Sequence, residues 1–272
     1  MSLRGTLRAA PTLLKVGFAE AIAYRVEMLV WVLSTTMPFV MLAMWSAVAR
    51  EEPVLAPGGG RFGPAEFAAY FLITFVVRQL TSSWAAWEMN FEVRTGSLSS
   101  RLLRPLNPLV AYAAENVAAL PMRIVLIIPV AIIVAVVTGG AHLPRDPWLW
   151  LAFFVAVSGA WLITFLANAA IGCLSLFMQQ SVKVMDVYLA LFFVFSGYLF
   201  PIQLFPAWLR SVADWLPFRY QIGFPVELLN SMHTRREALE MLGRELAIAG
   251  AMLALVWGLW TRGLKRFQAF GG

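Results

Sequence analysis

Charge, cysteine and histidine are all scarce in this sequence, and each scarcity excludes a class of protein. Charged residues make up 13% of the 272 residues and hydrophobic residues 60%, whereas soluble domains carry roughly 25% charged residues. The single cysteine, Cys173, excludes an intramolecular disulfide and leaves the redox compartment open. The two histidines lie far apart, each without the clustered partners of a metal site. The composition therefore predicts an integral membrane protein without a bound metal.

Motifs for nucleotide, hydrolytic and proton chemistry are also missing. The glycine-rich stretch GGGRFG at 58–63 lacks the lysine and the following serine or threonine of a phosphate-binding loop. No Gly-x-Ser-x-Gly elbow occurs, and no predicted span holds the pair of carboxylates that proton-driven carriers use. We therefore expect a chain that is not an enzyme, binds no cofactor, and leaves any nucleotide hydrolysis to another protein.

The hydrophobic residues gather in long runs that carry almost no charge. About 20 residues of helix cross the roughly 30 Å of bilayer hydrocarbon, and none of the runs alternates with the two-residue period of a membrane barrel. A basic and apolar segment before the first run suits a helix in the membrane interface. We expect one all-α transmembrane domain over residues 1–272, with an interfacial helix at 3–26 and six spans at about 28–49, 65–86, 117–138, 147–178, 187–202 and 246–261.

Lysine and arginine are distributed unevenly over the predicted loops. The N-terminal segment, the loop between the second and third spans, the turn at 178–186 and the C-terminal tail together hold modestly more of them than the loops on the other side. Because basic loops stay in the cytoplasm, we expect both termini to be cytoplasmic in a bacterial plasma (inner) membrane. The formal net charge of +6 then reflects loops that face the lipid bilayer, and we expect no nucleic-acid partner.

A charged amphipathic segment at residues 87–115 separates the second and third predicted spans. Its leucines recur at helical spacing, which predicts a short helix near 97–104 that Gly96 starts and Pro105 ends. One interpretation is a solvated loop whose leucines rest on the bilayer surface, and the other is a helix that docks into a soluble partner. The predicted apolar face comprises Leu98, Leu102, Leu103 and Leu106, and the opposite side Ser99, Ser100, Arg101 and Arg104.

Gly197 and Pro201 interrupt the fifth predicted span near its outer end. Glycine weakens a helix interior and proline removes a hydrogen bond, so the pair predicts a bend. We expect residues 202–232 to dip back into the membrane as short amphipathic pieces that cap a pathway, with Pro206 among the residues of this outer gate. The alternative is a helix that simply ends before an aqueous loop.

Two arginines lie inside predicted spans, where charge is costly unless it reaches water or a partner. Arg78 lies near the inner end of the second span and is expected to extend to the interface. The alternative is a buried Arg78 that pairs with Glu92 or Glu115 or contacts a transported molecule. Arg123 is expected to extend in the same way from the third span, where Pro129 predicts a kink.

Three stretches in this order resemble the permease subunits of type 2 ABC transporters, an exporter class with six helices per subunit. The first is EVRTGSLSSRLLRPLNP at 92–108, which is similar to the cytoplasmic coupling segment of that class. The second is SGYLFPIQLFPAWLRSVADWLPFRY at 196–220, which is similar to the end of its fifth helix and the outer helices that follow. The third is the basic tail GLKRFQAFG at 263–271.

The resemblance implies an export pathway formed with a second permease subunit, identical or a sibling, above two copies of a separate ATPase that binds ATP. The subgroup it suggests is that of the viologen- or drug-exporter-like permeases, and the charge-rich region 203–245 departs from the pattern. The implied outer gate comprises Gly197, Pro201 and Pro206. The implied ATPase-coupling residues are Glu92, Arg94, Gly96, Leu98, Arg101, Leu102, Leu103, Arg104 and Pro105.

Two other functions fit six spans without catalytic residues. A membrane scaffold or assembly factor would transport nothing itself. A secondary carrier would need an ion or proton site at the midplane, and Arg78 and Arg123 are the residues nearest to that description. The sequence does not name the transported molecule.

Overall fold

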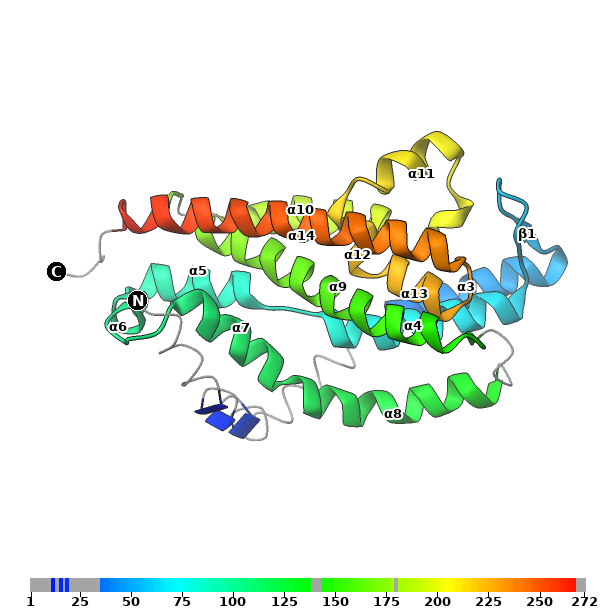
Figure 1. Ribbon diagram of the computed structural model, residues 1–272, viewed down its shortest axis with the longest axis horizontal. Coiled ribbons are helices and arrows are strands. Elements are labelled where there is room, and N and C mark those ends of the chain that lie inside the picture. The colour runs from blue at the N-terminus through cyan, green and yellow to red at the C-terminus, as the bar shows by residue number, and fades with distance from the viewer. Residues whose placement is uncertain are drawn as a thin grey trace.

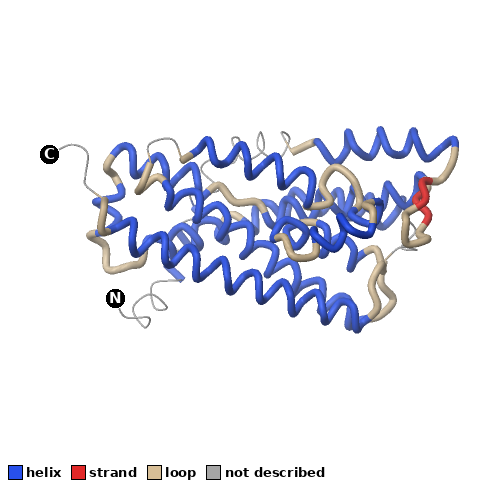
Figure 2. Tube along the Cα trace, turned by 90° about the horizontal axis from the view of Figure 1, so that it is seen from above, coloured by secondary structure: helices blue, strands red, loops and turns tan. Residues whose placement is uncertain are grey.

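The fold is an elongated bundle of helices (Figures 1 and 2). The computed structural model of the chain describes residues 11–12, 15–16, 18–19, 35–137, 143–178 and 181–267. The predicted interfacial helix 3–26 and residues 28–34 of the first predicted span lie largely outside this part. In the described residues the only strands are two of two residues each, which pair in one hairpin, and this confirms the all-α class.

The first described helix, α3 (Met37–Glu51), pairs with α4 (Pro64–Thr81) through a hairpin of β1 (Val54–Leu55) and β2 (Arg61–Phe62). The hairpin is antiparallel, with Val54 opposite Phe62. Pro64 occupies the first turn of α4, where its missing N–H costs nothing. Aromatic rings stack between the two helices, as Trp45 does on Phe67 at 5.4 Å between ring centres. The connection between α3 and α4 is therefore an ordered hairpin between paired helices.

Four helices follow, and they change the second and third predicted spans. The second span was expected at 65–86, but α4 ends at Thr81 because Ser82 is extended. A bent pair follows, in which Pro108–Val125 meets Ile127–Ile133 at an angle of 47°, so the break lies inside the last of the four helices. Pro129 cannot donate to the carbonyl of Val125, so the predicted kink is confirmed. The helices are α5 (Ala85–Thr95), α6 (Leu98–Leu102), α7 (Pro108–Ala118) and α8 (Leu120–Val137).

The two longest helices, α9 (Pro147–Leu174) and α14 (Arg235–Leu264), pack along each other through the centre of the bundle (Figure 1). They are the two described helices that are long and apolar enough to cross a membrane, and the bent pair would be a third. Six spans therefore remain a prediction. The last span was expected at 246–261, yet α14 starts at Arg235, because Thr234 and Glu237 form a capping box there.

The fifth predicted span, 187–202, is shifted and shortened. Its helix, α10 (Val182–Phe195), has 14 residues, which is about 21 Å of helix against a hydrocarbon thickness of about 30 Å. The chain then turns back through η1 (Ile202–Leu204), α11 (Ala207–Ala213), α12 (Pro217–Gln221) and α13 (Gly223–Leu229). Every residue from Phe218 to Leu229 is buried, since α12 and α13 pack against α9, and α13 also against α4. Residues 218–229 of this return segment are therefore part of the core, whereas Trp208 and Val212 of α11 are exposed.

Candidate functional site

The α5–α6–α7 segment forms one end of the long axis, and its turns are specified by sequence (Figure 1). Gly96 adopts φ 76°, and its N–H donates to the carbonyl of Val93. It therefore terminates α5 with a left-handed residue, as glycine commonly does, and the chain enters α6 directly afterwards. Asn107 accepts a hydrogen bond from the N–H of Leu109 at 3.0 Å and caps α7.

Arg101 lies at the centre of this segment and binds three carboxylates from α5 and α7. Its guanidinium lies 2.7 Å from Glu92, 3.1 Å from Glu88 and 2.8 Å from Glu115. It also lies 4.3 Å above the ring of Tyr112, whose hydroxyl donates to Glu92 at 2.6 Å. The sequence placed Arg101 on the side of the helix opposite the leucines, and in the structure its side chain points into the segment and binds these partly buried acids. We call Arg101, Glu88, Glu92, Tyr112 and Glu115 the acid cluster.

The acid cluster holds more negative than positive charge, and this affects the pKa of Glu88. Burial, together with the neighbouring Glu115 carboxylate, raises the pKa of Glu88 to about 8. The raised pKa favours the protonated form of Glu88, which places a proton beside the Glu115 carboxylate. One proton thus reduces the repulsion between three carboxylates that share a single guanidinium.

The leucines of α6 do not form the single docking face that their spacing predicts. Leu98 is 1% exposed and Leu102 is partly buried, and both pack against the cluster around Met89 and Tyr112. Leu103 is 87% exposed. Leu98 faces inward because α6 is only one turn that folds back onto α5. Four of the exposed residues of the segment, Arg94, Leu103, Arg104 and Pro105, form what we call the α6 tip.

At the far end of α10, Gly197 forms a tightly packed turn. It adopts φ 82°, and its carbonyl accepts a hydrogen bond from the hydroxyl of Tyr70 at 2.7 Å. A Cβ at this position would lie 2.6 Å from that hydroxyl. Pro201 is buried at the start of η1, and Pro206 is exposed before α11. Gly197 therefore ends the helix, and Pro201 lies beyond it rather than inside a span.

The buried return segment holds an ion-pair network that the sequence reading missed. Arg219 binds Glu227 at 2.8 Å and also Asp214, while the Nε2 atom of His233 lies 2.6 Å from Glu227. Both Arg219 and Glu227 are under 5% exposed. The sequence signal that could have revealed this network is a pair of opposite charges in the otherwise mostly apolar stretch FRYQIGFPVELL, at 218–229.

A family model described as ABC-2 family transporter protein matches residues 60–271. The chain belongs to the ABC-2 family. The matched range runs from the hairpin through α14 and includes both the acid cluster and the Gly197 turn. The chain is therefore a multi-pass membrane protein and a membrane permease of an ABC transporter, as the three stretches predicted. Permeases of this family generally work with an ABC ATPase and are themselves non-catalytic. No curated protein matches the chain.

In this ABC-2 permease, Arg78 makes neither of the predicted acidic pairs. Its guanidinium lies 5.0 Å above the ring of Phe192 and 5.9 Å from that of Tyr198. Glu92 and Glu115, the partners considered for it, bind Arg101 instead. Cation–π contacts with the α10 end therefore hold Arg78 in place.

Arg123 does not extend to an interface as predicted, because it is 5% exposed. It donates to the carbonyls of Gln79 at 3.1 Å and Ser82 at 3.0 Å. These carbonyls lie at the end of α4, where helix geometry leaves them without partners and the helix dipole is negative. Arg123 thus caps α4 and links it to α8.

Glu245 is a buried acid that the sequence reading placed just outside the last span. It is 1% exposed on α14, and its Oε1 atom has no hydrogen-bond partner in the described structure. Gly159 of α9 faces it so closely that a Cβ there would lie 2.6 Å from the Glu245 carboxyl carbon. Groups of three potential metal ligands are absent from the described residues.

Proposed function

We propose that the chain is the permease subunit of an ATP-driven exporter in a bacterial inner membrane, with both termini cytoplasmic. The pathway forms between it and a second permease subunit, identical or a sibling, and two copies of a separate ATPase bind ATP. Family membership supports the permease role, and the absence of a phosphate-binding loop from the sequence supports a separate ATPase.

The observation that carries the proposal is the α6 tip. It combines an 87% exposed Leu103 with Arg104 and Pro105, while the acid cluster fixes the base of the same turn to α5 and α7. An exposed apolar side chain on a fixed helical turn suits docking into a groove of a soluble partner. Motion of an ATPase would then pass through α5 and α7 to the helices that follow them.

Export also needs an outer gate, for which the buried return segment is the candidate. The Gly197 turn binds α4 through Tyr70, and Trp45 of α3 donates to the carbonyl of Leu199 at 3.0 Å. A change in the packing of α3 and α4 would therefore move this turn. We propose that ATP binding shifts the population between two such packings.

Reconstitution in liposomes tests the function. The purified chain is inserted with and without the ATPase that co-purifies with it, and methyl viologen movement and ATP hydrolysis are measured. ATP-driven movement that requires both proteins supports the exporter. A permease that stimulates no hydrolysis and moves nothing with its ATPase present would indicate a scaffold or assembly factor.

Glu245 supports a second candidate, the secondary carrier. A buried carboxyl without a counter-charge on a long apolar helix suits a proton-binding group. In the same liposomes, methyl viologen movement driven by a proton gradient without the ATPase, and lost in Glu245→Gln, would favour the carrier over the exporter.

A further inference from the structure

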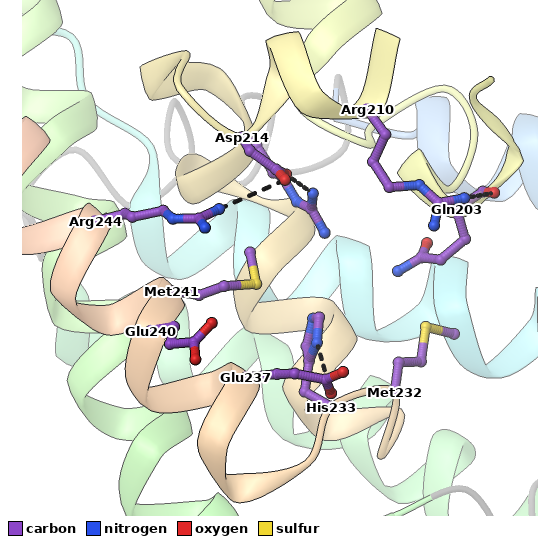
Figure 3. A pocket seen from close by; sticks show the side chains of 10 residues that line it. Gln203, Arg210, Asp214, Met232, His233, Glu237, Glu240, Met241 and Arg244 are labelled. Carbon is purple, nitrogen blue, oxygen red and sulfur yellow. Dashed lines mark hydrogen bonds and ion pairs between the residues drawn. The ribbon is translucent and has the colours of Figure 1, made fainter. Parts of the chain in front are cut away.

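A cavity of about 280 Å³ opens between α11, the residues after α13 and the first turns of α14 (Figure 3). It lies well away from the α6 tip along the molecule (Figure 1). Its wall carries three arginines and three carboxylates, together with a histidine and two methionines. A lining with equal numbers of opposite charges favours a ligand that itself carries both signs, since a simple anion or cation would meet repulsion.

The carboxylates of this cavity differ in how firmly they are held. Asp214 binds Arg219, and Glu237 accepts from the N–H of Thr234 at 2.8 Å as the cap of α14. Glu240 pairs with Arg236 at 3.1 Å, and both side chains are more than half exposed. Exposed pairs of this spacing contribute little. Glu240 is therefore the carboxylate available to a cationic group.

Two of the arginines have donors to spare. Arg210 donates to the backbone carbonyl of Gln203, its Nε atom is buried without a hydrogen-bond partner, and no ion pair joins it to a described carboxylate. Arg244 lies 3.6 Å from Asp214, which is too long for a hydrogen bond, and 5.5 Å from the ring of Trp215. Figure 3 shows Arg210 reaching in from α11 and Arg244 from α14, on either side of Asp214.

We propose that this cavity binds a phosphoethanolamine group, with the phosphate on Arg210 and Arg244 and the amine on Glu240. The fork of a guanidinium matches phosphate oxygens in bidentate hydrogen bonds. The volume of about 280 Å³ is large enough for such a headgroup. Met232 and Met241 provide apolar wall for the carbon atoms between the two charges.

The group can come from a phospholipid or from a soluble phosphoester, and the surroundings favour the lipid. Trp208 and Trp215, at α11 and just after it, are 69% and 72% exposed, and Val212 between them is 47% exposed. Exposed tryptophans are enriched at the headgroup level of membranes. The cavity opens beside this aromatic surface, so a lipid in the adjacent leaflet can present its headgroup to Arg210 and Arg244.

Native mass spectrometry of the full chain from nanodiscs tests the proposal. Nanodiscs contain either phosphatidylethanolamine or phosphatidylglycerol, and soluble glycerophosphoethanolamine is titrated separately. We expect one retained phosphatidylethanolamine per chain. Retention should fall by about tenfold in Arg210→Gln/Arg244→Gln, because charge-assisted hydrogen bonds to phosphate are lost. Glu240→Gln should remove the preference over phosphatidylglycerol.

Arg61→Gln is the matched control, since Arg61 is an exposed arginine of the hairpin outside the cavity. Arg210→Lys/Arg244→Lys keeps both charges and should give an intermediate loss even if the glutamine variant folds poorly. Binding of glycerophosphoethanolamine without lipid retention would support the site and assign it to a soluble phosphoester. Equal retention of both lipids by the wild type, or equal loss in Arg61→Gln, would overturn the proposal.

Discussion

At the scale of single residues, the decisive contacts are those of arginines with groups that would otherwise be buried without a partner. Arg101 forms ion pairs with three carboxylates, Arg123 binds the free carbonyls of α4, and Arg219 binds Glu227. Each arginine joins elements that are separate in sequence. Replacing one of them should therefore loosen a junction between helices rather than one helix alone.

Arg101→Met should destabilise the α5–α7 end by about 2–3 kcal/mol, because removing one partner leaves carboxylates buried without a counter-charge. The expected result is faster amide hydrogen exchange in α5 and α7, with α9 and α14 unchanged. Arg104→Met is the control, since Arg104 is exposed on the α6 tip. Equal exchange in the two variants would show that the acid cluster does not hold this end together.

The raised pKa of Glu88 predicts that the acid cluster weakens as pH rises. Its pKa of about 8 exceeds the usual value of 4.5, so the folded state binds the proton more tightly than the unfolded state. The stabilisation is complete below about pH 4.5 and is lost progressively as pH rises through about 8. Amide exchange in α5, corrected for its intrinsic pH dependence, should therefore increase between about pH 4.5 and pH 8 and level off above it. Glu88→Gln mimics the protonated acid and should remove this increase, and a variant that retains it would refute the assignment.

At the scale of elements, helix ends decide where the chain turns. Two glycines show the contrast between a turn that requires glycine and a helix interior that does not. Gly197 has φ 82° and is packed against Tyr70, whereas Gly243 lies in α14 with open space around it. A left-handed residue other than glycine costs about 1–2 kcal/mol. Helix-interior glycine, by contrast, costs roughly 0.5–1 kcal/mol relative to alanine.

Gly197→Ala should therefore destabilise the protein by more than about 1–2 kcal/mol, since the Cβ also meets the hydroxyl of Tyr70. Gly243→Ala should stabilise it by about 0.5–1 kcal/mol. Thermal unfolding in detergent, followed by tryptophan fluorescence, measures both. Opposite signs are the expected outcome, and a neutral Gly197→Ala would mean that the turn is replaceable.

Which parts of these elements were predictable depends on whether the signal is local. The kink at Pro129, the break at Gly197 and the helical class follow from backbone chemistry within a few residues. The direction of Leu98, the role of Arg101 and the burial of Glu227 depend on segments that meet only after folding. The early start of α14 was a local signal, Thr234 with Glu237, that was overlooked beside the apolar run.

The α6 tip carries a prediction that the structure sharpens. Leu102 packs against the protein itself and Leu103 does not, so Leu103→Ser alone tests docking without disturbing the fold. Burying a leucine contributes about 1.5–3 kcal/mol. Loss of the side chain should then weaken stimulation of the ATPase about tenfold or more. Leu55→Ser, an equally conservative change at the exposed hairpin, is the control, and unchanged stimulation by Leu103→Ser would remove the tip from the interface.

At the scale of the whole molecule, one chain offers few helices for a pathway. Two described helices can cross a membrane alone, and the rest are bent, broken or short. Exposed apolar side chains also run along α10 in a single stripe of Val187, Leu191 and Val194. This stripe leads directly into the Gly197 turn. A second subunit placed against it would position the pathway beside both return segments.

Cross-linking tests this arrangement. In a Cys173→Ala background, Leu191→Cys should form a disulfide-linked dimer in oxidised membranes if the stripe of α10 faces a second copy of this permease, as this arrangement requires. Leu253→Cys on α14 is the control, since it is similarly exposed and should face lipid. If the second subunit is a sibling permease, a cysteine placed in its corresponding helix should give a cross-linked product whose mass differs from that of the homodimer. If Leu253→Cys forms a dimer and Leu191→Cys does not, the subunit interface lies on α14. The return segments would then lie on opposite sides of the assembly instead of around one shared pathway.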